Sequence, residues 1–107
     1  MTAGELSRRI GGTLIAANAD NEISRGMVCD MLSHAMAHGK ARTAVQTHMT
    51  AVAIATQCSM ACIIWPDGIA ADMLSAQRAE HEGIAIICSP LSAYEIAGIM
   101  HKAGIQA

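Results

Sequence analysis

The sequence predicts an α/β fold: a single three-layer α/β/α domain with a mainly parallel sheet, spanning residues 1–107. Apolar runs at residues 61–65 and 84–88 are continuous rather than alternating, which is typical of strands buried on both faces. Stretches with helical capping signals separate these runs. The chain is 52% hydrophobic and 15% charged, so its 107 residues suffice for one core and one domain.

The first part of the chain begins with a short helix. Thr2, followed three residues later by Glu5, forms a capping box, and glycines 11–12 end the helix. Asp30 is a suitable N-cap for a later helix that Gly39 ends. The expected elements are a helix over 2–10, a strand over 13–17, a polar turn over 18–21, an extended piece over 23–28 and a helix over 31–38.

The second part alternates strands with helices. Ser92 and Glu95 form a second capping box, and Gly83 and Gly104 end the last two helices. The expected elements are a strand over 43–46, an apolar helix over 49–58, a strand over 61–65, a turn over 66–68, an amphipathic helix over 70–81, a strand over 84–88 and a helix over 92–102.

The apolar residues are unusual in kind, with no Phe, one Trp, one Tyr and eight Met. Small residues let helices lie close to a sheet, and flexible methionines fill the remaining gaps. Because a core poor in aromatic rings buries less area per residue, we expect a partner surface to help, most simply in a homodimer.

Charge and hydropathy exclude several classes of partner. A net charge of −2 with seven Lys and Arg predicts no binding to nucleic acid, which needs a concentrated basic surface. The most apolar stretch, residues 51–65, is interrupted by polar residues and is shorter than the roughly 20 residues that cross a bilayer. No signal peptide precedes the first helix, and the four cysteines show no close-spaced framework, so we expect reduced thiols and a cytoplasmic protein with no membrane contact.

Polar residues follow the predicted strands, where open α/β sheets usually bind ligands. Gln46, Thr47 and His48 follow one strand and Ser89 follows another. Helix N-termini at this edge would present free N–H groups to an anion or a nucleotide, so these four residues are the candidate ligand-binding residues. In the alternative interpretation, the hydroxyl groups only cap helices and His48 is an ordinary loop residue.

Two spaced pairs resemble metal ligands. His34 and His38 lie four residues apart on a predicted helix, but no acidic residue accompanies them, so solvated helix histidines are favoured over a metal site. Cys58 and Cys62 are also four apart, and without a second pair they are expected to be small buried residues. We therefore expect no metal site, with a cluster pooled between two chains as the alternative.

Motifs for catalysis are missing. The sequence has no Walker loop, no glycine-rich dinucleotide turn and no nucleophile elbow. Glycines 11–12 precede a strand rather than a helix, which makes them a helix stop and not a phosphate cradle. We expect neither an enzyme with catalytic residues nor a cofactor.

Three stretches of the chain resemble the DRTGG domain family, a small α/β module, over roughly residues 7–105. They are residues 27–33 with 36–40, residues 45–48 with 51–53, and residues 82–84 with 92–98. The chain departs from the family at Arg25-Gly26, where paired glycines are usual, and at Cys29, where glycine is common. A ligand that needs close backbone approach at that turn is therefore not expected here.

The resemblance implies a fold similar to the N-terminal domain of HPr kinase/phosphorylase. Members occur beside CBS domains in some pyrophosphatases, in phosphate acetyltransferases, and as stand-alone proteins near iron hydrogenase systems. The family role is regulation or subunit contact.

Three functional hypotheses follow. The first is a non-catalytic regulatory or assembly module that self-associates and docks on a partner enzyme, in a redox (hydrogenase-type) system. The alternative is a sensor of a nucleotide or anionic small molecule. The third is a metal or iron–sulfur carrier that uses the cysteines with His34 or His38.

Overall fold

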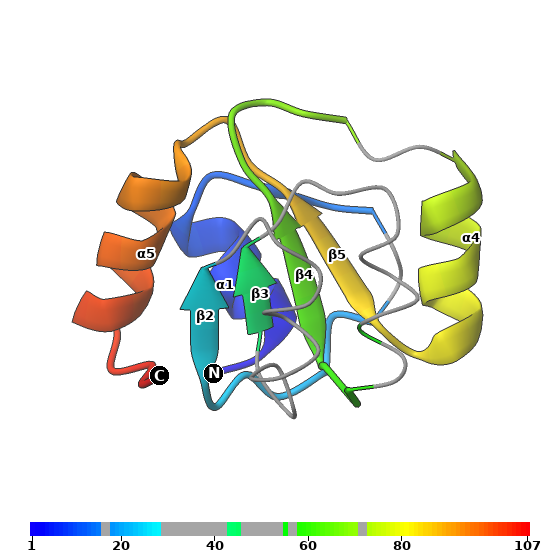
Figure 1. The fold of residues 1–107 in the computed structure, drawn as a ribbon, viewed down its shortest axis with the longest axis horizontal. Coiled ribbons are helices and arrows are strands. Elements are labelled where there is room, and N and C mark those ends of the chain that lie inside the picture. Colours follow the sequence, from blue (N-terminus) through cyan, green and yellow to red (C-terminus); the bar gives the residue numbers. More distant parts are fainter. Residues whose placement is uncertain (16–17, 29–42, 46–54, 56–57, 71–72) are drawn as a thin grey trace.

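The fold is described from a computed structural model (Figure 1). It describes residues 1–15, 18–28, 55, 58–70 and 73–107, and the backbone of 43–45. The elements in chain order are α1 (Ala3–Arg9), β1 (Thr13–Leu14), β2 (Gly26–Val28), β3 (Thr43–Val45), β4 (Cys62–Trp65), α4 (Met73–Glu82), β5 (Ala85–Cys88) and α5 (Ala93–Lys102). The predicted helix over 31–38 and most of that over 49–58 lie outside the described residues.

The strands in the described part of the chain form one five-stranded sheet, in the order β1-β5-β4-β3-β2. The pairs β2–β3, β3–β4 and β4–β5 are parallel, and only the edge strand β1 runs antiparallel to its neighbour β5. The register sets Trp65 opposite Cys88 at the carboxyl ends of β4 and β5. The predicted mainly parallel sheet in an α/β fold is therefore confirmed.

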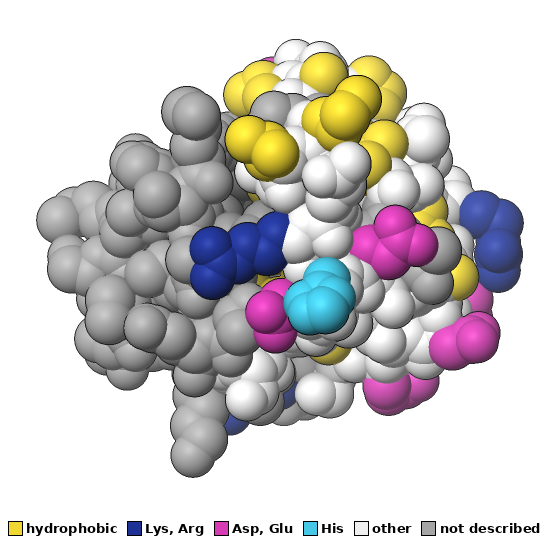
Figure 2. Space-filling model, turned by 90° about the vertical axis from the view of Figure 1, so that its right-hand side faces the viewer, with side chains coloured by type: hydrophobic (Ala, Val, Ile, Leu, Met, Phe, Trp, Pro, Cys, Tyr) yellow, Lys and Arg dark blue, Asp and Glu magenta, His cyan; other side chains and the backbone are white. Residues whose placement is uncertain are grey.

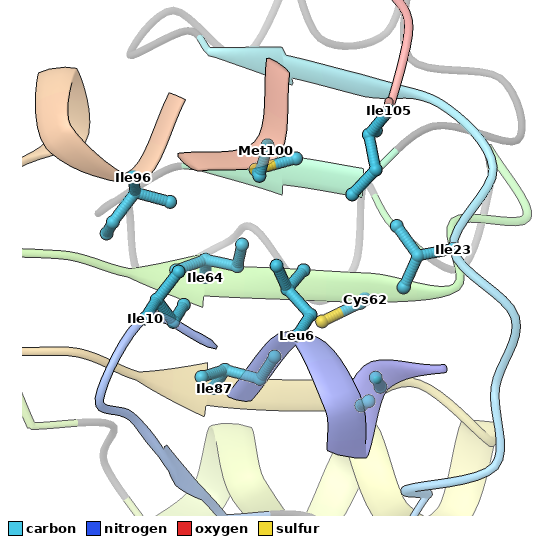
Figure 3. Close-up of a cluster of buried hydrophobic side chains, with 11 residues drawn as sticks. Leu6, Ile10, Ile23, Cys62, Ile64, Ile87, Ile96, Met100 and Ile105 are labelled. Atoms are coloured by element: carbon cyan, nitrogen blue, oxygen red, sulfur yellow. The ribbon is translucent and has the colours of Figure 1, made fainter. Parts of the chain in front are cut away.

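The buried side chains form a separate core on each face of the sheet. Successive residues of a strand point to opposite faces, so Ile63 and Trp65 enter one core while Cys62 and Ile64 enter the other. The first core also contains Ala79 of α4. The second core, in Figure 3, joins side chains of α1 and α5 to the central strands.

Local sequence signals fix the ends of α1 and α5. The hydroxyls of Thr2 and Ser92 each accept a hydrogen bond from the backbone N–H three residues later, which completes both predicted capping boxes. At the end of α1, Gly11 has φ of +61° and the N–H of Gly12 donates to Ser7 O at 2.8 Å. This arrangement reverses the chain into β1 and confirms the predicted helix stop.

Helix α4 differs from the prediction in its start and its orientation. Ala70 is not helical, because it follows a tight turn in which the N–H of Ile69 donates to Pro66 O at 3.1 Å. The helix buries two small residues, Ser75 and Ala79, one turn apart. Its large apolar residues are therefore not the ones that pack on the sheet.

Within the described part of the chain, no helix is long and apolar enough to span a bilayer. The longest described helices, α4 and α5, have ten residues each.

Candidate functional site at the carboxyl ends of β4 and β5

Of the four candidate ligand-binding residues, the structure describes one. Gln46, Thr47 and His48 lie outside the described residues. Ser89 follows β5 directly, at the carboxyl edge of the sheet, as predicted. Whether the four side chains meet around one ligand stays a prediction.

The hydroxyl of Ser89 is engaged inside the protein. It is 1% exposed, donates to Ile10 O at 2.7 Å and accepts from the N–H of Leu91 at 3.2 Å. The backbone of Ser89 donates to Trp65 O at 2.9 Å and accepts from the N–H of Gly68, also at 2.9 Å. Ser89 thus fastens the end of α1 and the turn after β4 to the loop after β5.

A pocket of about 340 Å³ opens beside Ser89. Residues 13 and 15 line one side, and residues 68–70 and 88–90 line the other. The turn between β4 and the pocket wall has Asp67 and Gly68 at φ of 60° and 71°, the positive pair that a type I′ turn requires. This turn places Gly68 and Ile69 against the loop that follows β5.

The pocket is not built for an anion. The N–H groups of Gly68 and Ile69 already donate to Ser89 O and Pro66 O, and Pro90 has no N–H to offer. Among the described residues that line the pocket there is no Lys, Arg or His, and the exposed Asp67 precedes Gly68 of its wall. An uncharged apolar group is therefore the occupant that these walls suit, because it needs no polar partner.

Exposed apolar side chains occur in the wall of this pocket and at the start of α4, shortly after Ala70 of that wall, and we call this set the end patch. It comprises Ile15 and Ile69, 41% and 40% exposed, and Met73 and Leu74, 75% and 77% exposed. Figure 2 shows hydrophobic side chains gathered at this end of the molecule. The end patch was not predicted from the sequence. The only signal available was the spacing of Ser75 and Ala79, which turns Met73 and Leu74 away from the sheet.

The cysteines do not form a metal site in the described part. Cys58 belongs to the core beside α4 and Cys62 to the core on the opposite face, so the two thiols do not converge. Burial raises the pKa of the Cys62 thiol and keeps it protonated. Cys88 is partly exposed in the pocket wall. Among the described residues, no three His, Cys, Asp or Glu side chains are grouped as metal ligands, and Cys29, His34 and His38 lie outside them.

A second pocket, of about 250 Å³, lies between β2, α5 and the residues that follow α5. There the N–H of Gly26 donates to Gln106 O at 2.7 Å, and Arg25 Nε donates to the backbone oxygen of Ala107 at 3.0 Å. These bonds hold the segment after α5 along the outer edge of β2. Ser89, the one candidate ligand-binding residue in the described part of the chain, does not line this pocket.

Comparison with known proteins supports the fold. No family pattern and no curated protein matches the sequence. Among solved structures, the chain is similar to the CBS and DRTGG domains of the regulatory region of Clostridium perfringens pyrophosphatase, complexed with the activator diadenosine tetraphosphate. The TM-score is 0.78 at 10% identity, over 92% of this chain and 45% of that chain. The likeness at this identity is one of fold, and the fold is of the kind found in those regulatory domains.

Proposed function

We propose that this chain is a non-catalytic regulatory module that self-associates and docks on a partner enzyme. The observation that carries the proposal is the end patch, which includes two exposed residues of the pocket wall, Ile15 and Ile69. Contiguous exposed apolar surface favours association, since covering it removes apolar area from water. Docking through such a surface needs no reacting side chain.

The fold likeness also supports this proposal. The similar protein is the regulatory region of a pyrophosphatase, and we propose a role of the same class here. For the partner, our first candidate is a redox enzyme of the hydrogenase type, which the resemblance to the DRTGG family implies for a stand-alone member.

Two measurements test the proposal. Light scattering across a wide concentration range should show the mass rising from 11.1 kDa toward twice that value. Adding the chain to a purified candidate enzyme should change its KM or kcat. A mass that stays at 11.1 kDa, together with unchanged kinetics of each candidate enzyme, would contradict the proposal.

The second candidate function is a sensor of a nucleotide or another anionic small molecule. Two observations favour it: the similar structure is complexed with diadenosine tetraphosphate, and Ser89 lies at the sheet edge where α/β domains bind ligands. We propose that Gln46, Thr47 and His48 supply the polar contacts.

Thermal unfolding with diadenosine tetraphosphate, ATP and inorganic phosphate tests the sensor function. A ligand at 100 times its Kd raises the free energy of unfolding by about 2.7 kcal/mol. The shift should disappear in Thr47→Val and His48→Ala and persist in Ser24→Ala, which changes an exposed serine elsewhere. No shift with any of the three compounds would count against it.

We further propose that residues 1–107 form one DRTGG-like domain, a three-layer α/β/α unit that works in the cytoplasm. The placement of α4 on one face of the sheet and of α1 and α5 on the other supports the three layers. A single cooperative unfolding transition is expected, and two separate transitions would argue against one domain.

A further inference from the structure

We infer that the pocket beside Ser89 receives Leu74 of a second copy of this chain, so that a two-fold dimer exchanges two Leu74 side chains between two pockets. The inference rests on the self-association in the proposed function and names the surface that performs it. Two features support the inference: the described walls of the pocket carry no charged side chain, and the start of α4 is exposed.

The pocket is suited to an aliphatic side chain. Its volume of about 340 Å³ exceeds that of a leucine side chain, and its walls hold Ile15, Ile69 and Pro90. The turn N–H groups beside it are already paired, so an entering polar group would find few replacements, such as the Thr13 hydroxyl, for its hydrogen bonds to water. Leucine has no such group to lose.

The side chain that we place in the pocket, Leu74, follows Ala70 of the pocket wall by four residues along the chain. Leu74 is 77% exposed and Met73 is 75% exposed, the largest exposed fractions among the apolar residues of α4. A two-fold axis brings a surface against itself, so a patch with both a pocket and a protruding side chain is complementary to its own copy. A helix that packs through Ser75 and Ala79 leaves Leu74 free to reach the partner.

Area and charge agree with a second copy as the occupant. The end patch exposes on the order of 400 Å² of apolar surface, close to the apolar share of the about 800 Å² that each subunit buries in a standard interface. Asp67 lies beside the pocket, and Arg78 lies one helical turn after Leu74. Both are exposed and have no ion-pair partner in the described part of the chain. The opposite charges of Asp67 and Arg78 could therefore pair between two copies that meet through this surface.

Crosslinking tests the contact directly, because Cys88 lines the pocket and is partly exposed. The variant Leu74→Cys, treated with a short bismaleimide, should give a covalent dimer, and the added change Cys88→Ser should abolish it. Tyr94→Cys is the matched control, since Tyr94 is 89% exposed on α5 and outside the end patch. A Leu74→Cys dimer that survives Cys88→Ser, or one no more abundant than with Tyr94→Cys, would overturn the inference.

Equilibrium measurements separate this inference from the proposed function. Leu74→Asn and the pocket-filling Ala70→Arg should each weaken dimerisation at least tenfold by light scattering, while Tyr94→Ser leaves it unchanged. Asp67→Asn with Arg78→Gln should weaken it no more than either change alone. A wild-type chain that never dimerises would refute self-association itself. A wild-type dimer that tolerates Leu74→Asn and Ala70→Arg would refute this surface alone.

Discussion

Replacing Ser89 with alanine removes a hydroxyl that lies at the edge of the candidate pocket and makes two hydrogen bonds. The first joins the hydroxyl to Ile10 O at 2.7 Å, and Ile10 is completely buried. The second accepts the N–H of Leu91, which is partly buried. Ser89→Ala therefore leaves the buried Ile10 carbonyl with neither its hydrogen-bond donor nor water, and it leaves the Leu91 N–H with only partial access to water.

The expected loss in the free energy of unfolding depends on how well water reaches these two backbone groups. A buried polar group left without a partner costs about 1–3 kcal/mol, whereas the N–H of Leu91 recovers part of its loss by binding water. We expect Ser89→Ala to lower the free energy of unfolding by about 2 kcal/mol. For 107 residues the unfolding entropy is about 0.22 kcal/mol/K, so Tm falls by about 9 °C.

Urea unfolding followed by circular dichroism measures this cost. Ser24→Ala is the matched control, because Ser24 is exposed and should change stability by less than about 0.5 kcal/mol. If Ser89→Ala were as mild as Ser24→Ala, the hydroxyl would not be holding the loop. Such a result, combined with a lost nucleotide-induced shift in Tm, would favour the sensor function over the structural role argued here.

Three further predictions concern the caps, the thiols and the core. The pKa of Glu5 is lowered, first by the hydrogen bond that its carboxylate accepts from the Thr2 backbone N–H. Its contribution to stability is therefore present above the unfolded-state pKa and is lost as pH falls through the folded-state pKa. NMR titration of Glu5 should give a lower midpoint in the folded protein than in the urea-unfolded chain. A thiol reagent should modify the partly exposed Cys88 in the native protein and Cys62 only after unfolding, and equal rates would contradict the burial of Cys62. Ile64→Ala, at the centre of the sheet, should cost about 3 kcal/mol in urea unfolding, and a cost below about 1 kcal/mol would contradict its packing.

The sequence predicted those features that depend on neighbours along the chain. The capping boxes at Thr2 and Ser92 involve residues three positions apart, so their pattern is readable directly. The runs that became β4 and β5 are continuous and apolar because both of their faces are covered. These local signals were enough to identify a parallel α/β fold.

Features that depend on distant residues were not readable. The acceptor of the Ser89 hydroxyl, Ile10, lies 79 positions away, so no local pattern distinguishes this serine from a ligand-binding one. Asn21 in the predicted polar turn donates from its side chain to Ala61 O at 2.9 Å and to Gly83 O at 2.7 Å, another long-range contact. The hydrophobic periodicity of the sequence also did not predict the order of the strands or the antiparallel pairing of β1 with β5.

The orientation of α4 was also not predicted from the sequence, and it bears on the proposed function. Hydrophobic periodicity assigns the largest apolar residues to the core, yet α4 packs through Ser75 and Ala79 and exposes Met73 and Leu74. Small residues let the helix approach the sheet closely, but they bury little area, so the helix gives up stability that larger residues would provide. A chain that folded for stability alone would gain by turning Leu74 inward. The exposure of Leu74 is what the proposed self-association would require, because a second molecule that covers it would remove its apolar surface from water.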